Sequence, residues 1–136
     1  MRGAHPDDVE GLRMRPMSRQ MMSELEVTTV ADFVSKLKPS KAAATMTGGD
    51  AEKGKQTWST CAACHGPGGM GNEALKAPPL VDQHDWYLLT SLHKFKDGVR
   101  GLPNDPAAMT MKPMAMTLTS EEMMKNVVAY VGTLNR

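Results

Sequence analysis

Residues 61–65 read Cys-Ala-Ala-Cys-His, and this short run restricts the fold of the chain more than any other feature. The pattern C-x-x-C-H is typical of covalent attachment of c-type haem. Two cysteines at this spacing lie one helical turn apart, so both thiols can add to vinyl groups on one porphyrin edge as thioethers. The adjacent imidazole then lies beneath the ring as the proximal iron ligand. The run therefore predicts a chain folded around a haem that Cys61, Cys64 and His65 hold.

Two other interpretations of the cysteine pair fit the sequence less well. A thioredoxin-like redox pair requires a βαβ context, and no alternating strand pattern is present. A structural zinc site requires further ligands at a recognisable spacing, which His84 and His93 do not provide. These two histidines and His5 are expected at the surface or in hydrogen bonds.

Composition agrees with a cofactor-filled domain. Aromatic residues make up only 4% of the 136 residues, and a buried haem would supply the missing apolar core. Thirteen methionines are available to fill irregular gaps around it. A net charge of +1 indicates neither a nucleic-acid partner nor an anionic membrane surface. No stretch approaches the roughly 20 apolar residues of a membrane span.

The N-terminal residues contain no apolar signal-peptide core. Covalent haem is normally attached outside the cytoplasm, so we expect a periplasmic (extracytoplasmic) protein whose leader lies outside this sequence.

The most visible boundary is the small, polar segment 39–49, which ends in a glycine pair and is expected to be a linker. Residues 50–136 form one unit behind it. Its expected helices run from an Asp50 cap to about Thr60, from an Asp85 cap through 86–96, and from a Thr119–Glu122 capping box onward. The predicted class is all-α, with three main helices and long loops at 66–79 and 98–118 that wrap the cofactor.

The loop before the last helix offers methionines as a second axial ligand. They are Met109, Met111, Met114 and Met116. Met114 is preferred because Pro113 restricts the backbone before it. Met111 and Met116 remain alternatives.

Several segments together resemble a class I cytochrome c, and are most similar to the bacterial two-haem cytochrome c-four family. They are Gly-Asp-Ala-Glu-Lys-Gly-Lys (49–55), the Cys-x-x-Cys-His run, Ala-Pro-Pro-Leu (77–80), Asp-Trp-Tyr-Leu-Leu (85–89), Phe95, Gly98, Arg100 and the Met-x-Pro-Met segment. The resemblance implies that Met114 is the distal ligand and that the Pro78 carbonyl accepts a hydrogen bond from His65. It also implies a close crossing of the first and last helices at Gly54 and Tyr130.

Three further residues are candidates for the haem surroundings. Trp86 and Tyr87 are expected in core or haem-edge packing, with polar tips that can reach a propionate. Arg100 is a candidate partner of a propionate, and a solvated surface role is equally open.

Residues 1–38 repeat the end of the chain, and from the Met-x-Pro-Met runs onward the register does not shift. The matching pairs are Met1-Arg2-Gly3 with Val99-Arg100-Gly101, Met14-Arg15-Pro16-Met17 with Met111-Lys112-Pro113-Met114, Ser23-Glu24 with Ser120-Glu121, and Val30, Phe33, Val34 and Leu37 with Val127, Tyr130, Val131 and Leu134.

This segment therefore resembles the C-terminal half of a second domain, with one helix from Ser23 to Leu37 and no C-x-x-C-H of its own. We expect Val27, Val30, Val34 and Leu37 to form a buried stripe on that helix. Met17 then occupies the ligand position of a second haem. The stripe is expected to pack on the intact domain, in a domain-swapped dimer, or on an N-terminal fragment outside this sequence.

The expected function is one-electron transfer in a respiratory chain through His/Met-ligated haem c, and not enzymatic turnover. The resemblance implies redox partners such as a quinol–cytochrome c reductase and a terminal oxidase. Two alternatives remain: the cytochrome subunit that accepts electrons from a periplasmic dehydrogenase, and a haem enzyme or gas sensor with an open distal position.

Overall fold

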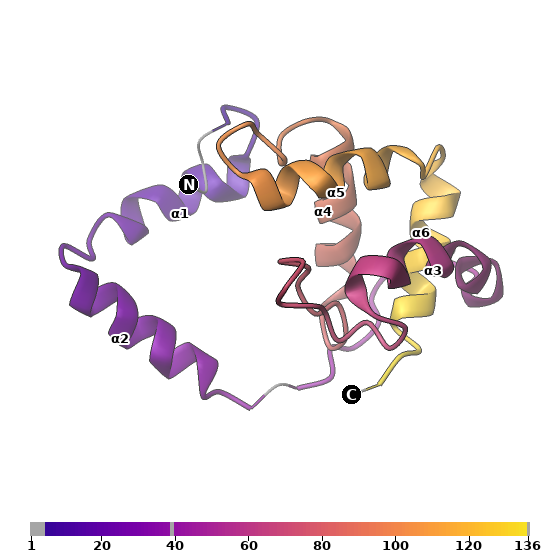
Figure 1. The fold of residues 1–136 in the computed structure, drawn as a ribbon, viewed down its shortest axis with the longest axis horizontal. Coiled ribbons are helices and arrows are strands. Elements are labelled where there is room, and N and C mark those ends of the chain that lie inside the picture. The colour runs from indigo at the N-terminus through magenta and orange to yellow at the C-terminus, as the bar shows by residue number, and fades with distance from the viewer. Residues whose placement is uncertain (1–4, 39, 136) are drawn as a thin grey trace. The chain divides into compact units, whose positions relative to one another are not determined.

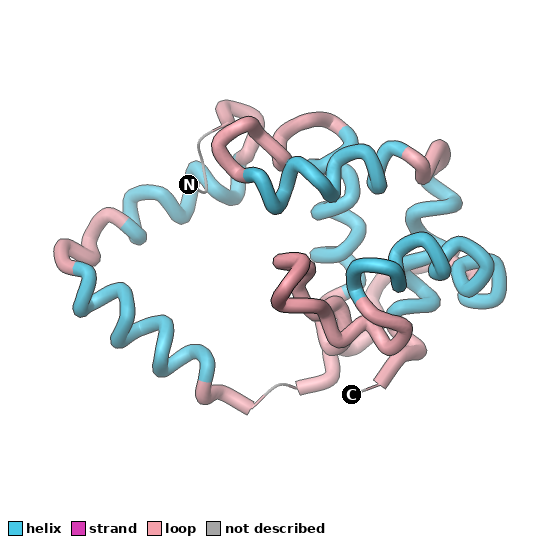
Figure 2. The backbone as a smooth tube through the Cα atoms, in the orientation of Figure 1, coloured by secondary structure: helices cyan, strands magenta, loops and turns pink. Residues whose placement is uncertain are grey.

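The computed structural model describes residues 5–38 and 40–135. The chain forms two compact units, one that includes residues up to Ser40 and one that begins at Lys41. Among the described residues the regular structure is entirely helical (Figures 1 and 2). The helices are α1 (Val9–Ser18) and α2 (Glu24–Ser35) in the first unit, and α3 (Ala51–His65), α4 (Asp85–Lys96), α5 (Pro106–Met116) and α6 (Glu121–Val131) in the second. The all-α prediction is confirmed.

Helix α3 carries the C-x-x-C-H run. The Asp50 carboxylate caps it by accepting hydrogen bonds from the amides of Glu52 and Lys53, as the sequence predicts. The helix does not stop near Thr60 but continues through His65 and ends at Gly66, whose φ is 77°. The last turn of α3 therefore holds both thiols and the imidazole on one continuous helix.

Helices α3 and α6 cross closely at Gly54. A Cβ atom at this position would lie 2.0 Å from the Asn126 carbonyl oxygen and 2.9 Å from Tyr130 Cβ. The Trp58 and Tyr130 rings pack beside the crossing with centroids 5.9 Å apart. Asn126 is buried, and its side-chain oxygen accepts a hydrogen bond of 2.8 Å from the Asp50 amide. The expected close approach of Gly54 and Tyr130 is confirmed.

Helix α4 begins at Asp85, so the prediction that Asp85 caps it is wrong. The N-cap residue is His84, which makes no side-chain cap bond. The Asp85 carboxylate instead accepts hydrogen bonds from the Thr45 amide (2.5 Å), the Thr45 hydroxyl (2.6 Å) and the Met46 amide (2.7 Å). Desolvation raises the pKa of Asp85, but these bonds and one from the Trp86 amide outweigh it and lower the pKa to about 2.

Those hydrogen bonds change the interpretation of the predicted linker. Residues from Lys41 onward belong to the second unit, and Met46 packs against its core. Lys41 also donates to the Asn135 side chain across 3.1 Å. The segment 41–49 is therefore anchored along its length, whereas residue 39 lies outside the described residues.

The segment 98–118 is not the continuous loop that the sequence predicted. It contains α5, which Asp105 caps through the Ala108 amide and which has Pro106 in its first turn. Proline is well tolerated there because its missing N–H would have no helical partner. Pro113 lies inside the helix, where it removes one backbone hydrogen bond.

Helix α6 is capped by Ser120, whose hydroxyl accepts from the Met123 amide at 3.1 Å. The predicted Thr119–Glu122 box is therefore wrong by one residue, and the Thr119 hydroxyl instead donates to the Met123 sulfur. The inner face of α6 is almost fully buried and forms the centre of the core. The core residues are Trp58, Leu118, Met124, Val127, Val128 and Val131.

In the first unit, α1 and α2 begin at the positions equivalent to the starts of α5 and α6, and their ends agree to within one residue. Asp8 caps α1 and Ser23 caps α2, and the residues 97 positions later, Asp105 and Ser120, cap α5 and α6. Pro16 lies inside α1 as Pro113 does inside α5. The Ser23–Glu26 capping box is confirmed. The Met-x-Pro-Met run is thus helical in both copies, and the first unit contains two helices instead of one. The predicted match at residues 1–3 lies outside the described residues.

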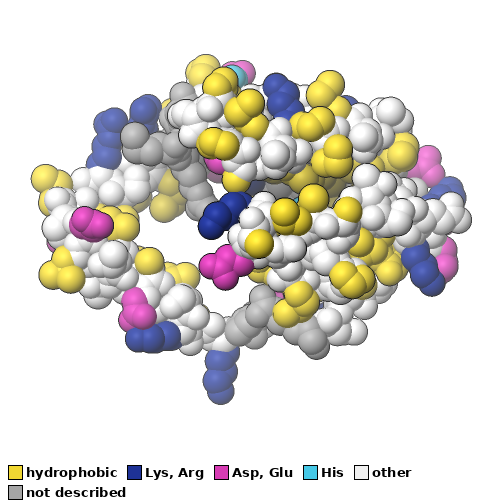
Figure 3. All heavy atoms as spheres, viewed as in Figure 1, with side chains coloured by type: hydrophobic (Ala, Val, Ile, Leu, Met, Phe, Trp, Pro, Cys, Tyr) yellow, Lys and Arg dark blue, Asp and Glu magenta, His cyan; other side chains and the backbone are white. Residues whose placement is uncertain are grey.

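The predicted buried stripe on α2 is exposed. Val27, Val30, Val34 and Leu37 are between 46% and 56% exposed, and hydrophobic side chains are visible along α2 in Figure 3. Their counterparts Met124, Val127 and Val131 on α6 are at most 6% exposed. The reason is the packing partner: α3 covers the face of α6, whereas α1 does not cover α2 in the same way.

Candidate haem-binding site

The site is organised around His65 at the end of α3. This imidazole is 6% exposed, and its Nδ1 lies 2.8 Å from the Pro78 carbonyl oxygen. A carbonyl oxygen can only accept, so Nδ1 carries the proton in this contact and Nε2 of the neutral ring keeps its lone pair. The predicted contact between His65 and Pro78 is present in the structure. It leaves Nε2 as the nitrogen that can bind a metal.

A glycine-rich loop carries Pro78 back to the end of α3. The Gly71 amide donates to the His65 carbonyl oxygen (2.9 Å), and the backbones of Asn72 and Ala77 exchange a pair of hydrogen bonds of 2.8 and 3.0 Å. The Leu80 amide then donates to the Gly69 carbonyl oxygen (2.8 Å). A hollow of about 380 Å³ lies along this loop between Met70 and Pro79.

The two thiols lie one turn apart on α3, Cys61 half-buried and Cys64 exposed, and both are free. Burial raises the pKa of the Cys61 thiol, a weaker backbone hydrogen bond opposes this, and Cys64 adds to the rise. Redox-active C-x-x-C pairs have a lowered thiol pKa, so this environment does not favour the redox interpretation. No three His, Cys, Asp or Glu side chains converge anywhere in the described part of the chain, so the zinc interpretation gains no support.

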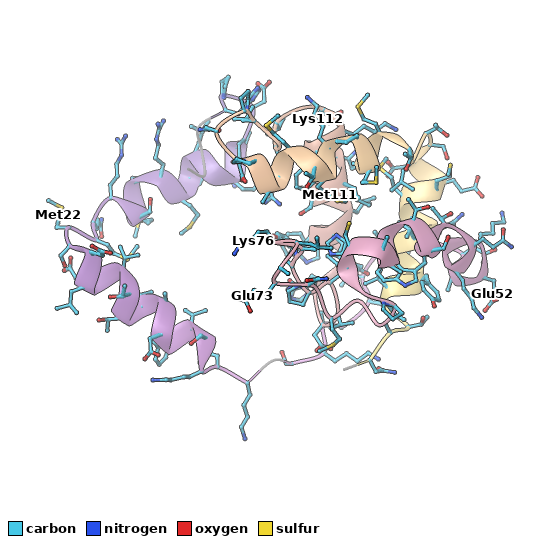
Figure 4. All side chains as sticks on the ribbon, viewed as in Figure 1. Met22, Glu52, Glu73, Lys76, Met111 and Lys112 are labelled. Atoms are coloured by element: carbon cyan, nitrogen blue, oxygen red, sulfur yellow. The ribbon has the colours of Figure 1, made fainter. Side chains whose placement is uncertain are left out.

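The candidate distal ligands lie on α5. Met114 is 40% exposed, Met109 45% and Met116 57%, whereas Met111 is half-buried. Met111 and Lys112 project from different sides of α5 (Figure 4). Among these four methionines the structure alone does not single out Met114.

Aromatic side chains and one arginine line α4. The Arg100 guanidinium lies over the rings of Tyr87 (5.8 Å to the centroid) and Phe95 (6.0 Å), and it donates to the Ser91 hydroxyl at 3.2 Å. Trp86 is 53% exposed and its ring meets Tyr87 edge-on at 6.1 Å. Trp86 is therefore a surface residue, while Arg100 is held against α4 by stacking.

His84 and His93 follow the prediction of a surface or hydrogen-bonded position. His84 is exposed and stacks on Trp86 with ring centroids 5.6 Å apart. His93 Nε2 lies 2.9 Å from a Glu121 carboxylate oxygen, which joins α4 to α6.

The donor set fits a covalently attached haem. A protonated Nδ1 held by Pro78 leaves a nitrogen lone pair for iron, and two unpaired thiols on the same helical turn provide the thioether bonds. Sequence reasoning did not single out Gly71, which links the His65 carbonyl oxygen to the Pro78 segment. The glycine-rich run 66–71 was the available signal, since glycine adopts the positive φ of 84° found at Gly71.

Comparison with known proteins agrees with this geometry. The family described as cytochrome c matches residues 51–135. Cytochrome c-554(548) from Halomonas halodenitrificans is 38% identical over 85 residues, which cover 62% of this chain and 96% of that protein. The thiosulfate dehydrogenase electron acceptor from Thiomonas intermedia is 34% identical over 111 residues, covering 74% of this chain and 49% of that protein. The chain thus spans about half the length of this second relative.

Among solved structures, reduced recombinant cytochrome c4 from Pseudomonas stutzeri superimposes with a TM-score of 0.73 at 26% identity. The match covers 91% of this chain and 67% of that one, so it includes parts of both units. Within the described residues, no helix combines the length and apolar character needed to cross a membrane. The fold, the covalent haem c and electron transfer between redox proteins follow from these relatives, and the chain belongs to the cytochrome c family.

Proposed function

We propose that the chain is a periplasmic electron carrier of a respiratory chain, with one covalent haem c attached through Cys61 and Cys64 and ligated by His65 and Met114. The observation that carries the proposal is the 2.8 Å contact between His65 Nδ1 and the Pro78 carbonyl oxygen. His65 directly follows Cys64 on α3, so the imidazole and the two thiols share the last turns of one helix. It fixes the orientation of the ring and leaves Nε2 for iron.

The haem supplies the one-electron chemistry, because its iron alternates between Fe(II) and Fe(III). The protein holds the ring and excludes water from it. The hydrogen bond donated by His65 Nδ1 increases the basicity of Nε2 and so favours the oxidised state. No general acid or base is required of any residue.

For the distal side we retain Met114, with Met111 and Met116 as the alternatives. Pro113 supports this choice in the helical context, since it removes the hydrogen bond that a residue at 113 would donate to the Met109 carbonyl oxygen. The last turn of α5 is consequently easier to adjust than an unbroken helix. Met114 lies directly after this weakened point.

The ligation is tested by spectroscopy of the holoprotein. Met114→Ala should remove the weak near-infrared band of thioether-to-Fe(III) ligation and allow carbon monoxide to bind the reduced form. Met111→Ala is the matched control, one helical turn earlier, and should keep both wild-type properties. The opposite pattern would assign the ligand to Met111. Carbon monoxide binding by the wild type would favour the open distal site of a sensor or enzyme.

Around the ring we assign supporting roles to Trp86, Tyr87 and Arg100. The Arg100 guanidinium is positioned by Tyr87, Phe95 and Ser91, and the donors that do not face Ser91 can pair with a haem propionate. Trp86 forms an exposed aromatic surface near the start of α4. Arg100→Gln should make the midpoint potential depend more strongly on pH, because the propionate would lose its cationic partner. The haem should remain attached.

The partners that we propose are a quinol–cytochrome c reductase as donor and a terminal oxidase as acceptor. A second candidate function is acceptance of electrons from a periplasmic dehydrogenase. It is favoured by the 34% identity to a thiosulfate dehydrogenase electron acceptor across 74% of this chain. Stopped-flow reduction of the oxidised protein by purified reductase and by purified thiosulfate dehydrogenase separates the two, because the physiological donor should react orders of magnitude faster.

We also propose a domain assignment: residues 1–38 are the C-terminal half of a cytochrome c-like domain and 50–136 are a complete mono-haem domain. The predicted linker 39–49 joins them, and its residues from Lys41 onward are anchored on the second unit. Support comes from the equivalent caps at Asp8 and Asp105 and at Ser23 and Ser120, and from the shared internal prolines. Met17 then stands where Met114 stands in the complete domain. Intact mass and haem quantification test this assignment. A second haem, assembled with another segment, would have Met17 as its ligand, whereas one haem per monomer would mean that Met17 only makes an apolar contact.

A further inference from the structure

The hydrogen bond between His65 and Pro78 depends on where the Pro78 carbonyl is held, and Pro78 lies 13 residues after His65. Pro78 itself is exposed, so burial of its side chain does not fix its position. The backbone contacts of the loop must therefore do so. They converge on one residue, Gly71.

Gly71 contacts both partners of the hydrogen bond. Its amide donates to the His65 carbonyl oxygen at 2.9 Å, which joins the loop to the end of α3. Its Cα faces the backbone of 77–79: an added Cβ would lie 2.7 Å from the Ala77 carbonyl oxygen, 2.7 Å from Pro79 N and 2.8 Å from the Pro78 carbonyl carbon. All three atoms belong to the main chain, so no side-chain rotation can relieve the overlap.

The neighbouring turn keeps the two strands of the loop in this register. Asn72 and Ala77 exchange two backbone hydrogen bonds, and the side chains of Glu73 and Lys76 between them project away from the loop (Figure 4). The turn therefore presses residues 77–79 against Gly71. A methyl group there would push directly on the carbonyl group that accepts from His65.

We propose that Gly71 is a positioning residue for the proximal histidine: its bare Cα lets 77–79 approach closely enough for the Pro78 carbonyl to hold His65 Nδ1 and thereby set the reduction potential. The proposal rests on the function proposed above, in which His65 binds iron. Loss of the hydrogen bond makes Nε2 a weaker donor, which disfavours the oxidised state and raises the potential.

The test uses the purified holoprotein and two substitutions at Gly71. Gly71→Ala adds the Cβ, and Gly71→Asn adds it with a residue that tolerates positive φ better. Gly48→Ala is the matched control, because Gly48 has nearly the same φ (83° against 84°) with no atom within 4 Å of its added Cβ. Both Gly71 variants should show a higher midpoint potential and faster exchange of the His65 Nδ1 proton by NMR. A tenfold loss of preference for the oxidised state corresponds to about 59 mV.

Gly71 variants with wild-type potential and wild-type Nδ1 proton exchange would overturn the proposal. If neither variant yields holoprotein, hydrogen exchange in the wild type provides the test. The Gly71 amide, the Ala77 amide and the His65 Nδ1 proton should exchange at one common rate, because they become exposed in the same opening of the loop. Independent exchange rates would refute the role of Gly71. Failure of the proposed function is recognised separately, by a wild-type spectrum that lacks thioether-linked, histidine-ligated haem.

Discussion

The crossing of α3 and α6 gives the sharpest stability prediction. Gly54→Ala should lower the free energy of unfolding, although alanine is the better helix former by about 1 kcal/mol. The added Cβ would lie 2.0 Å from the Asn126 carbonyl oxygen and 2.5 Å from its carbonyl carbon, so the two helices must move apart. Overpacking of this kind costs about 1–3 kcal/mol, and a backbone obstacle places it at the upper end.

The net loss is therefore about 2 kcal/mol after the gain in helix propensity. For a domain near 100 residues this corresponds to a melting temperature lower by roughly 8–16 °C. Thermal unfolding of the holoprotein, followed by circular dichroism at 222 nm, measures it. Gly68→Ala is the control, since its Cβ would meet only Met70 Cγ at 3.9 Å. A Gly54→Ala protein as stable as the wild type would show that the helices can separate at little cost, and the packing argument would then be wrong.

Four other outcomes are expected. Ser120→Ala should cost about 1 kcal/mol of stability and Thr119→Ala clearly less, because only Ser120 accepts from a helix amide. Asn126→Ala should cost about 1–3 kcal/mol in denaturant unfolding, since it leaves the Asp50 amide without its buried acceptor. The pKa of Asp85 in the folded protein is about 2, below its ordinary value of 3.8, so the stability that its carboxylate contributes is complete above pH 3.8 and is lost as the pH falls towards 2. The melting temperature of Asp85→Asn should therefore change less with pH between 3.8 and 2 than that of the wild type. Ser23→Ala should accelerate amide exchange in the first turn of α2, and unchanged exchange there would contradict the capping box.

The caps of α2 and α3 were predicted correctly from the sequence, where only one residue was a candidate for each cap. Asp50 and the Ser23–Glu26 pair are caps because their side chains reach amides two or three residues away. Thr119 and Ser120 both have hydroxyls, and the glutamate at 122 made the first of them look like the cap. The amide that is actually bound belongs to Met123, so the helix begins one residue later.

Helix α5 was not predicted from the sequence. The segment 98–118 was predicted to be a loop, yet it contains a helix that accommodates two prolines. Pro106 lies in the first helical turn, where its missing N–H would have no helical partner, and Pro113 lies so near the C-terminal end that few hydrogen bonds depend on it. The role of Asp85 was beyond local reasoning, because its partners Thr45 and Met46 are about 40 residues earlier in the chain. Gly71 is a similar case, because its role depends on the close approach of the backbone of residues 77–79.

The apolar periodicity of α2 predicted an amphipathic helix correctly but could not tell whether another surface covers it. The same spacing is buried on α6 because α3 lies against it, and exposed on α2. Periodicity records which face of a helix is suited to burial. The partner has to be known from elsewhere.

The uncovered face of α2 has a consequence for the fate of the molecule in a cell. Phe33 is 64% exposed and Leu25 75% exposed, beside the valines of the same helix. Exposed apolar segments of this kind are bound by chaperones and cleaved by proteases, which sets the abundance of a chain independently of its activity. A copy whose α2 face stays bare should have a short half-life, and a copy whose face is covered should persist. The helix would then serve as a quality-control signal that reports whether assembly is complete.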